Sequence, residues 1–69
     1  MNAGLPPWLH EGAKVFDPGV EREAIVQFIG EWQDPYTNRR FPNAVFLRPP
    51  SGGREWIANN PRVLRKADR

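Results

Sequence analysis

The sequence contains no cysteine and a single histidine, His10. Without cysteine the chain can form neither a disulfide framework nor a thiolate metal site. A lone histidine cannot supply the ligand set of a zinc ion, because zinc requires several nitrogen or sulfur donors. We therefore expect neither a metal nor a cofactor, and the lack of cysteine fits a reducing compartment.

Long apolar runs are also missing. No stretch approaches the roughly 20 apolar residues that cross a bilayer. Residues 1–7 contain neither the basic region nor the apolar run of a signal peptide. The sequence therefore predicts a cytoplasmic protein that has no membrane partner.

Residues suited to catalysis are scarce as well. The chain has no cysteine–histidine pair, and Gly52-Gly53 precedes Arg54 rather than the lysine of a phosphate-binding glycine loop. We interpret the two glycines as part of a hairpin turn and His10 as a solvent-facing residue. No catalytic residue is assigned, and a non-catalytic binding function is expected.

What the sequence does contain is frequent turn residues, with eight prolines and six glycines in 69 residues. Proline removes a backbone donor and clashes with the preceding helical turn, so long helices are not expected. Between these breaks lie short runs of β-branched and aromatic residues, which are typical of strands. The pattern predicts strands at 13–16, 23–29, 43–48, 54–58 and 63–65, a polar loop at 31–42 and a 3₁₀ turn at 59–61.

The hairpin that joins the third and fourth predicted strands has a testable register. A two-residue Ser51-Gly52 loop would place Leu47 opposite Trp56. A loop one residue longer would set Arg48 against Arg54, and like charges in that position destabilise a sheet. We prefer the register with the Ser51-Gly52 loop. A two-residue Gly52-Gly53 loop is the alternative. The preferred register assigns Val45, Leu47 and Trp56 to the core face, and Phe46, Arg48, Glu55 and Ile57 to the opposite face.

Charge is divided unevenly along a chain whose net charge is +2. Residues 1–34 carry six acidic and two basic side chains, net −4, whereas residues 35–69 carry eight basic and two acidic ones, net +6. Seven of those eight basic residues are arginine, whose planar fork of donors suits phosphates and carboxylates. This uneven distribution of charge favours a phosphate-bearing or acidic partner. The alternative is that the acidic and basic halves form ion pairs with each other, so that their charges largely cancel.

The order of these segments resembles a known fold. Gly12-Ala-Lys-Val15 leads into a short strand and an Asp-Pro-Gly turn, followed by an apolar strand, a variable loop, a hairpin, a one-turn 3₁₀ element and a final strand. Over residues 12–66 this order is similar to SH3-like barrels, including KOW and Tudor-type modules. The stretch from Val45 to Trp56 also resembles short uncharacterised actinobacterial proteins with a Leu-Arg-Pro…Gly-Gly-Arg-Glu-Trp hairpin.

We therefore expect an all-β protein, namely a small five-stranded SH3-like barrel with one 3₁₀ turn before its last strand. Its expected parts are an extended or loosely packed N-terminal arm over 1–11, the barrel over 12–66 and a charged tail over 67–69. An alternative for the arm is that Trp8 and Leu9 fold back onto the barrel. Peptide-binding SH3 domains carry an Ala-Leu-Tyr-Asp-Tyr motif and a Trp-Trp pair, and this sequence has neither. Because small barrels serve many unrelated functions, the function has to be argued from the side chains.

Two binding functions remain open. The first is binding of DNA or RNA, in which cationic side chains follow the phosphates while aromatic rings stack on bases. Its candidate residues are Arg39, Arg40, Arg48, Arg54, Arg62 and Arg65, together with Tyr36, Phe41 and Phe46. For Phe46, packing in the core is an equally good alternative.

The second function is protein interaction. Exposed aromatic and arginine side chains anchor interfaces, and a polarised charge distribution suits an acidic partner or self-association in a small assembly. The candidates are Trp8, Trp32 and Tyr36, for which capping of the barrel ends is the structural alternative. A contiguous positive face would favour nucleic acid, and arginines dispersed among acidic side chains would favour a protein partner.

Overall fold

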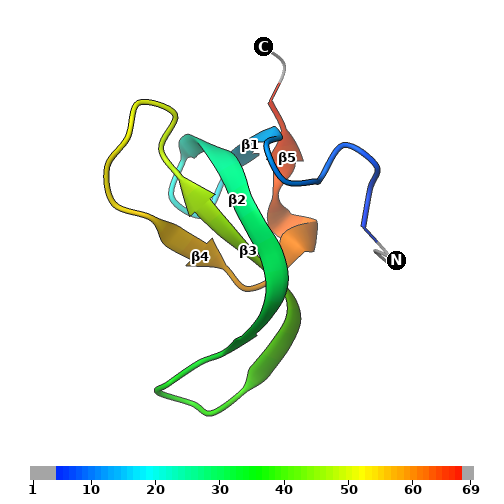
Figure 1. Ribbon diagram of the computed structural model, residues 1–69, viewed down its shortest axis with the longest axis vertical. Coiled ribbons are helices and arrows are strands. Elements are labelled where there is room, and N and C mark those ends of the chain that lie inside the picture. Colours follow the sequence, from blue (N-terminus) through cyan, green and yellow to red (C-terminus); the bar gives the residue numbers. More distant parts are fainter. Residues whose placement is uncertain (1–4, 68–69) are drawn as a thin grey trace.

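The computed structural model describes residues 5–67, which form five antiparallel strands in one sheet (Figure 1). The elements are β1 (Lys14–Asp17), β2 (Arg22–Gln33), β3 (Arg40–Arg48), β4 (Trp56–Ala58), the 3₁₀ turn η1 (Pro61–Val63) and β5 (Arg65–Lys66). No α-helix occurs within residues 5–67. The prediction of an all-β fold with five strands and a 3₁₀ turn before the last strand is therefore confirmed.

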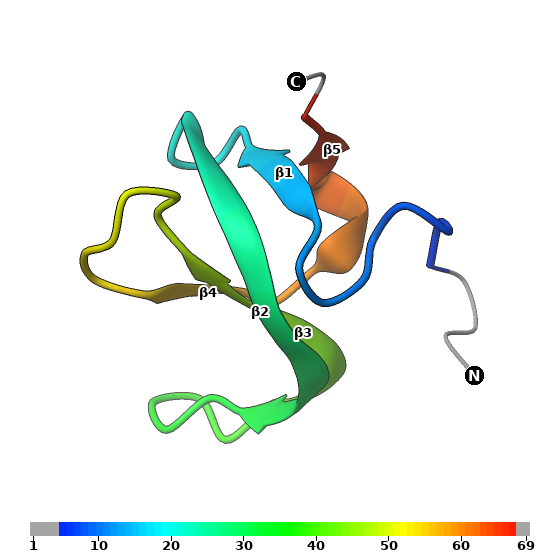
Figure 2. The same cartoon turned by 45° about the horizontal axis from the view of Figure 1, so that its top comes forward.

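The strands lie across the sheet in the order β4-β3-β2-β1-β5, so the first and last strands of the chain are neighbours. Each sequential pair from β1 to β4 forms an antiparallel ladder. Figures 1 and 2 show that the sheet is strongly curved, with the short β4 and β5 at its two edges. This curvature lets the concave side of one sheet enclose a core.

The core is built from small and branched apolar side chains on that inner side. Its members are Leu9, Ala13, Val15, Ala24, Val26, Val45, Leu47, Ala58 and Leu64, each at most 8% exposed. Leu9 comes from the expected arm and is only 1% exposed, so the alternative in which Trp8 and Leu9 fold back onto the barrel is the one that the structure adopts. Residues 5–11 contain turns, with hydrogen bonds from Leu9 N to Pro6 O (3.0 Å) and from Ala13 N to His10 O (3.0 Å). Residues 1–4 of that segment and residues 68–69 of the expected tail lie outside the described residues.

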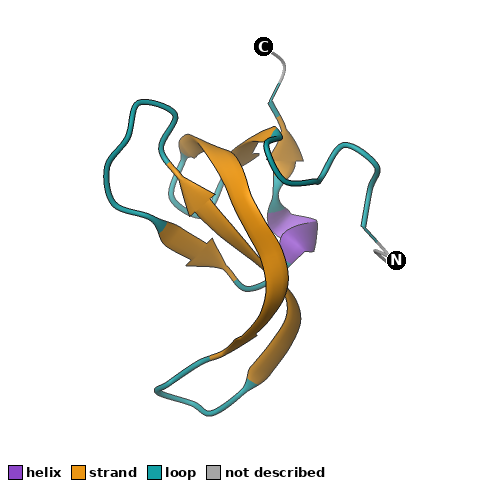
Figure 3. Ribbon diagram, viewed as in Figure 1, coloured by secondary structure: helices purple, strands orange, loops and turns teal. Residues whose placement is uncertain are grey.

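The β2–β3 hairpin is much longer than the sequence pattern suggests. Residues 31–42 were predicted to be a loop, but residues 31–33 extend β2 and residues 40–42 extend β3. Figure 3 shows this hairpin projecting away from the remaining strands. Polar residues can continue the ladder there because both faces of the projecting part meet solvent, where a polar strand costs little. The loop prediction was therefore wrong except at residues 34–39.

The register of β3 and β4 follows the prediction, although the loop does not. Leu47 pairs with Trp56, and Phe46 pairs with Ile57. The ladder ends at the Leu47–Trp56 pair. Residues 49–55 form a wider connection, which includes a hydrogen bond from Gly52 N to Pro49 O (3.1 Å). Proline cannot donate to the ladder, so a Pro-Pro sequence directly after β3 ends the pairing early. The predicted two-residue loop was wrong for this reason.

A buried carboxylate links two strands that are not neighbours in the sheet, β1 and the edge strand β4. Asp17 is 6% exposed, and its Oδ2 accepts a hydrogen bond of 2.9 Å from Nε1 of Trp56. Its Oδ1 accepts a second one, also 2.9 Å, from the backbone N of Gly19. Since β1 and β4 are not neighbours in the sheet, this contact spans the concave side rather than a ladder. The Arg22 guanidinium lies 5.1 Å from the centre of the Trp56 ring and covers it.

Candidate functional site

An extra residue in β2 places an aromatic side chain on the outer side of the sheet. Val26 pairs with Leu47 and Phe28 pairs with Phe46, so Gln27 between them is a β-bulge. Strict alternation from the buried Val26 would turn Phe28 into the core. The bulge reverses this, leaving Phe28 48% exposed. The bulged Gln27 itself donates a hydrogen bond of 2.9 Å to Glu55.

Two aromatic pairs lie along this outer side. The rings of Phe28 and Phe46 meet edge to face with their centres 5.6 Å apart. Further along the hairpin, Trp32 and Phe41 are cross-strand partners whose rings are stacked, with centres 5.9 Å apart and an interplanar angle of 24°. We call the outer surface formed by Phe28, Trp32, Phe41 and Phe46 the aromatic face.

A pair of small residues separates the two aromatic pairs. Gly30 pairs with Ala44, and the ring of Phe28 reaches across Gly30, where an added Cβ would lie 2.5 Å from a ring carbon. Ala44 is 0% exposed although it does not belong to the core cluster. Its register places it on the outer side, between the two aromatic pairs. The small Gly30–Ala44 pair thus lies between the two aromatic pairs, and the Phe28 ring spans part of that gap.

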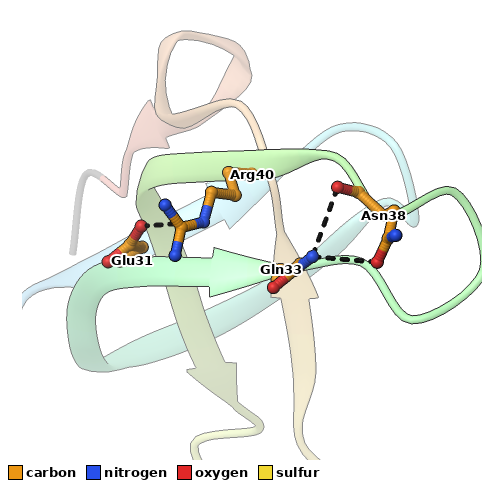
Figure 4. Close-up of polar contacts among 4 residues, drawn as sticks. All are labelled: Glu31, Gln33, Asn38 and Arg40. Carbon is orange, nitrogen blue, oxygen red and sulfur yellow. Dashed lines mark hydrogen bonds and ion pairs between the residues drawn. The ribbon is translucent and has the colours of Figure 1, made fainter.

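The tip of the hairpin is held by a network of hydrogen bonds. Asp34 N donates to Arg39 O, and Asn38 N donates to Asp34 O, each at 2.8 Å. Asn38 adopts a positive φ of 64°, and its side-chain oxygen accepts a 2.8 Å hydrogen bond from Gln33 Nε2 (Figure 4). Tyr36 lies within this loop and is 94% exposed, while its backbone N donates to Asp34 Oδ1 at 2.8 Å. A well-bonded loop therefore presents a fully solvated phenol ring.

Two of the predicted arginines accompany the aromatic face. The Arg39 guanidinium lies 5.4 Å from the centre of the Phe41 ring, a cation–π contact. Arg48 is exposed and pairs with Ile25 next to the inward-facing Val26–Leu47 pair, so its side chain is on the outer side. The two cations thus lie near opposite ends of the aromatic face.

The other predicted arginines lie elsewhere. Arg40 pairs with Gln33 on the opposite side of the hairpin, and its Nε lies 3.4 Å from a carboxylate oxygen of Glu31 (Figure 4). This ion pair joins the acidic and basic halves of the chain. Arg54 lies in the β3–β4 connection, Arg62 in η1 and Arg65 in β5. The six arginines therefore do not share one face, because Arg40 lies on the other side of the hairpin from Arg39 and Arg48, and Figure 1 shows the β3–β4 connection well apart from the β2–β3 tip.

The three residues predicted for protein interaction also separate. Trp8 is half-buried and packs against the core cluster. Trp32 belongs to the aromatic face, and Tyr36 stands exposed at the tip. Phe28 was missed by the sequence reasoning, because a bulge at Gln27 leaves no signal in a run that is apolar on both faces. Phe46, for which core and surface were equally good alternatives, is half-buried on the outer side.

Residues 5–67 hold no pocket and no group of three or more His, Cys, Asp or Glu side chains arranged to bind a metal. Within the same range, no helix is long and apolar enough to cross a membrane. Comparisons of the chain with protein-family models, curated proteins and solved structures gave no match.

Proposed function

We propose that this protein binds single-stranded nucleic acid, without catalysis, on the aromatic face of the β2–β3 hairpin. The observation that carries the proposal is the placement of two aromatic pairs and two arginines along the outer side of one hairpin, whose tip loop carries the exposed Tyr36. Small β proteins that bind single strands combine stacking rings with cations that follow the phosphates. This combination is present here on one surface.

The aromatic rings supply the stacking component. Phe28 is the most exposed ring of the aromatic face, and Tyr36 is almost fully exposed at the tip. Each base stacked on such a ring contributes about 1–3 kcal/mol. In a duplex, both faces of each base are covered by the neighbouring bases. A base must first be unstacked before it can lie on a protein ring, and this costs a few kcal/mol. Binding should therefore favour single strands over duplexes.

The arginines supply the phosphate-binding component. Arg39 and Arg48 lie on the same side as the rings, and the guanidinium group forms charge-assisted, often bidentate, hydrogen bonds with phosphate oxygens. Arg40 is already engaged by Glu31 and faces the other way, so it is left out of the proposed site. The proposal thus retains two of the six arginines selected from the sequence.

We further propose that the fold is SH3-like. Support comes from the pairing of the last strand with the first, the long central β2 and the 3₁₀ turn between β4 and β5. Hydrogen exchange of the Trp56 Nε1 proton tests this assignment, because its hydrogen bond to Asp17 spans the concave side of the rolled sheet. Slow exchange is expected, and exchange as fast as that of an exposed indole would contradict it.

A protein partner on the same face is the second candidate, and one observation favours it. The arginines are spread over the hairpin tip, the β3–β4 connection, η1 and β5 rather than gathered on one surface. Aromatic and arginine side chains are also the commonest anchors of protein interfaces. The experiment below separates the two candidates because a protein interface has no reason to bind oligonucleotides with a steep salt dependence.

Fluorescence anisotropy with labelled single-stranded DNA, single-stranded RNA and duplex DNA at two salt concentrations tests the proposal. We expect single strands to bind more tightly than the duplex, with an affinity that falls as salt rises. The double substitution Arg39→Ala and Arg48→Ala should abolish this binding. Arg62→Ala with Arg65→Ala removes the same charge from other elements and serves as the matched control.

Three results would contradict the proposal. These are no binding at low salt, equal binding of duplex and single strands, and an equal loss of affinity in the matched control. If oligonucleotides do not bind, sedimentation of the wild type and of Phe28→Ala then tests the second candidate. Self-association that depends on Phe28 would support a protein partner on the aromatic face.

A further inference from the structure

The aromatic face is a narrow row that follows one hairpin rather than a broad patch. Along β3 and the tip, Arg48 and Arg39 are nine residues apart, and Phe46 and Phe41 lie between them. At about 3.3 Å per residue the two arginines are therefore separated by up to roughly 30 Å along the strand. Tyr36 lies beyond Arg39 in the tip loop.

We infer that this row binds one segment of about four to nine nucleotides, laid along the hairpin with phosphates at Arg48 and Arg39. The inference rests on the proposed function and adds to it the length and the end points of the bound segment. A stacked strand advances about 3.4 Å per nucleotide, so roughly nine nucleotides cover the row. When bases leave the stack to lie on protein rings, the distance per nucleotide increases and fewer nucleotides cover the row. Small β proteins bind as few as about four nucleotides.

The two ends of the row are chemically different. At one end Arg48 pairs with the apolar Ile25, and no ring lies beyond it on β3. At the other end, Arg39 covers Phe41, and the tip loop presents the exposed ring of Tyr36. The hydrogen bonds of Asp34 and Asn38 hold that loop in place, which lowers the entropy cost of stacking a base there. Tyr36 is accordingly the terminal stacking residue of the segment.

The arrangement of the rings also determines which of them a base can contact. Trp32 and Phe41 cover one side of each other, and Phe46 meets the ring of Phe28 edge to face. Phe28, which is 48% exposed, and Tyr36, which is 94% exposed, have the most free ring surface. These two rings are the stacking positions at the middle and at the end of the row.

A length series of labelled deoxythymidine oligomers, from about 2 to 14 nucleotides, tests the inference by anisotropy. Affinity should rise steeply with length up to a break between about four and nine nucleotides, and only slightly beyond it. Tyr36→Ala should weaken the longer oligomers about 5- to 150-fold and move the break to a shorter length. Because the Tyr36 side chain is almost fully exposed, this substitution should leave the fold intact.

The salt dependence of binding tests the end points independently. For single strands, each phosphate contact contributes about 0.7 to the slope of log K against log salt. Arg39→Ala and Arg48→Ala should each lower the slope by about that amount. Arg62→Ala should leave it unchanged, because Arg62 lies in η1 outside the proposed site.

The outcomes separate the two levels of the proposal. Binding with no break below about nine nucleotides, or with a break that Tyr36→Ala does not move, would overturn the inferred segment while single-strand binding stands. An equal change of slope in Arg62→Ala would overturn the assigned end points. Absence of binding to every oligomer would overturn the proposed function itself.

Discussion

The ring of Phe28 lies across Gly30, two residues further along the same strand. A Cβ at Gly30 would come within 2.5 Å of one ring carbon and 2.6 Å of another. The glycine therefore has a packing role here, because the ring occupies the space that a side chain would fill. The absence of a side chain at Gly30 thus allows the Phe28 ring to lie in its place on the aromatic face.

Gly30→Ala should displace the Phe28 ring and break its edge-to-face contact with Phe46. Such contacts contribute about 0.5–1.5 kcal/mol, so the free energy of unfolding should fall by about that amount. A double-mutant cycle with Phe28→Ala measures this coupling, since Gly30→Ala should cost much less once the ring is absent. Additive effects in urea denaturation would show that the ring does not lie across Gly30 in solution.

Trp56→Phe should destabilise the fold by about 1–3 kcal/mol. The substitution keeps most of the apolar ring but removes the Nε1 donor, leaving an oxygen of the buried Asp17 without that hydrogen bond. Urea denaturation measures the change in the free energy of unfolding. Trp32→Phe is the comparison, because Trp32 keeps a stacking partner and has no such buried acceptor. A Trp56→Phe variant no less stable than the Trp32→Phe variant would contradict the importance of this hydrogen bond.

Leu9→Ala should cost about 2–5 kcal/mol, which is the range for truncating a buried leucine. Leu9 is 1% exposed, whereas its neighbour His10 is exposed. His10→Ala should therefore change the stability very little. Thermal unfolding of the two variants tests whether the N-terminal segment is part of the core. Equal midpoints would mean that Leu9 does not pack there.

Glu31→Gln should change the free energy of unfolding by no more than about 1 kcal/mol. Its ion pair with Arg40 is 3.4 Å long, but both side chains are more than half exposed. Water and salt screen such pairs, and holding two long side chains together costs entropy. Chemical denaturation at low and high salt provides the measurement. A loss of several kcal/mol would show that this ion pair holds the projecting hairpin.

Part of the candidate site could be read from the sequence. Arg39, Arg48, Phe41, Phe46 and Tyr36 were selected because arginines and aromatics alternate along one stretch, and the structure places them along one hairpin. Phe28 was not selected. A bulge depends on how two strands fit together, so a run that is apolar on both faces does not reveal which residue it will turn outward.

The arginines illustrate the same limit. Residues 35–69 are rich in arginine, and that charge asymmetry was visible without any structure. Position along the chain does not say which side of a strand a residue occupies when register shifts intervene. Alternation puts the neighbours Arg39 and Arg40 on opposite sides, but it does not say which of them joins the aromatic face; in the structure Arg39 covers Phe41 and Arg40 pairs with Glu31. A shift between Gly30 and Trp32 lies within that part of the ladder.

The sequence by itself determined the all-β class, the number of strands and the pairing of Leu47 with Trp56. The class and the number of strands follow from local causes, namely proline and glycine breaks and β-branched runs, and the pairing agrees with the register that the alternation of apolar residues favours. Only the tertiary structure decided the length of the β2–β3 hairpin, the outward turn of Phe28 and the burial of Leu9 and Asp17. These depend on contacts between residues distant in sequence, whose energies no local pattern contains.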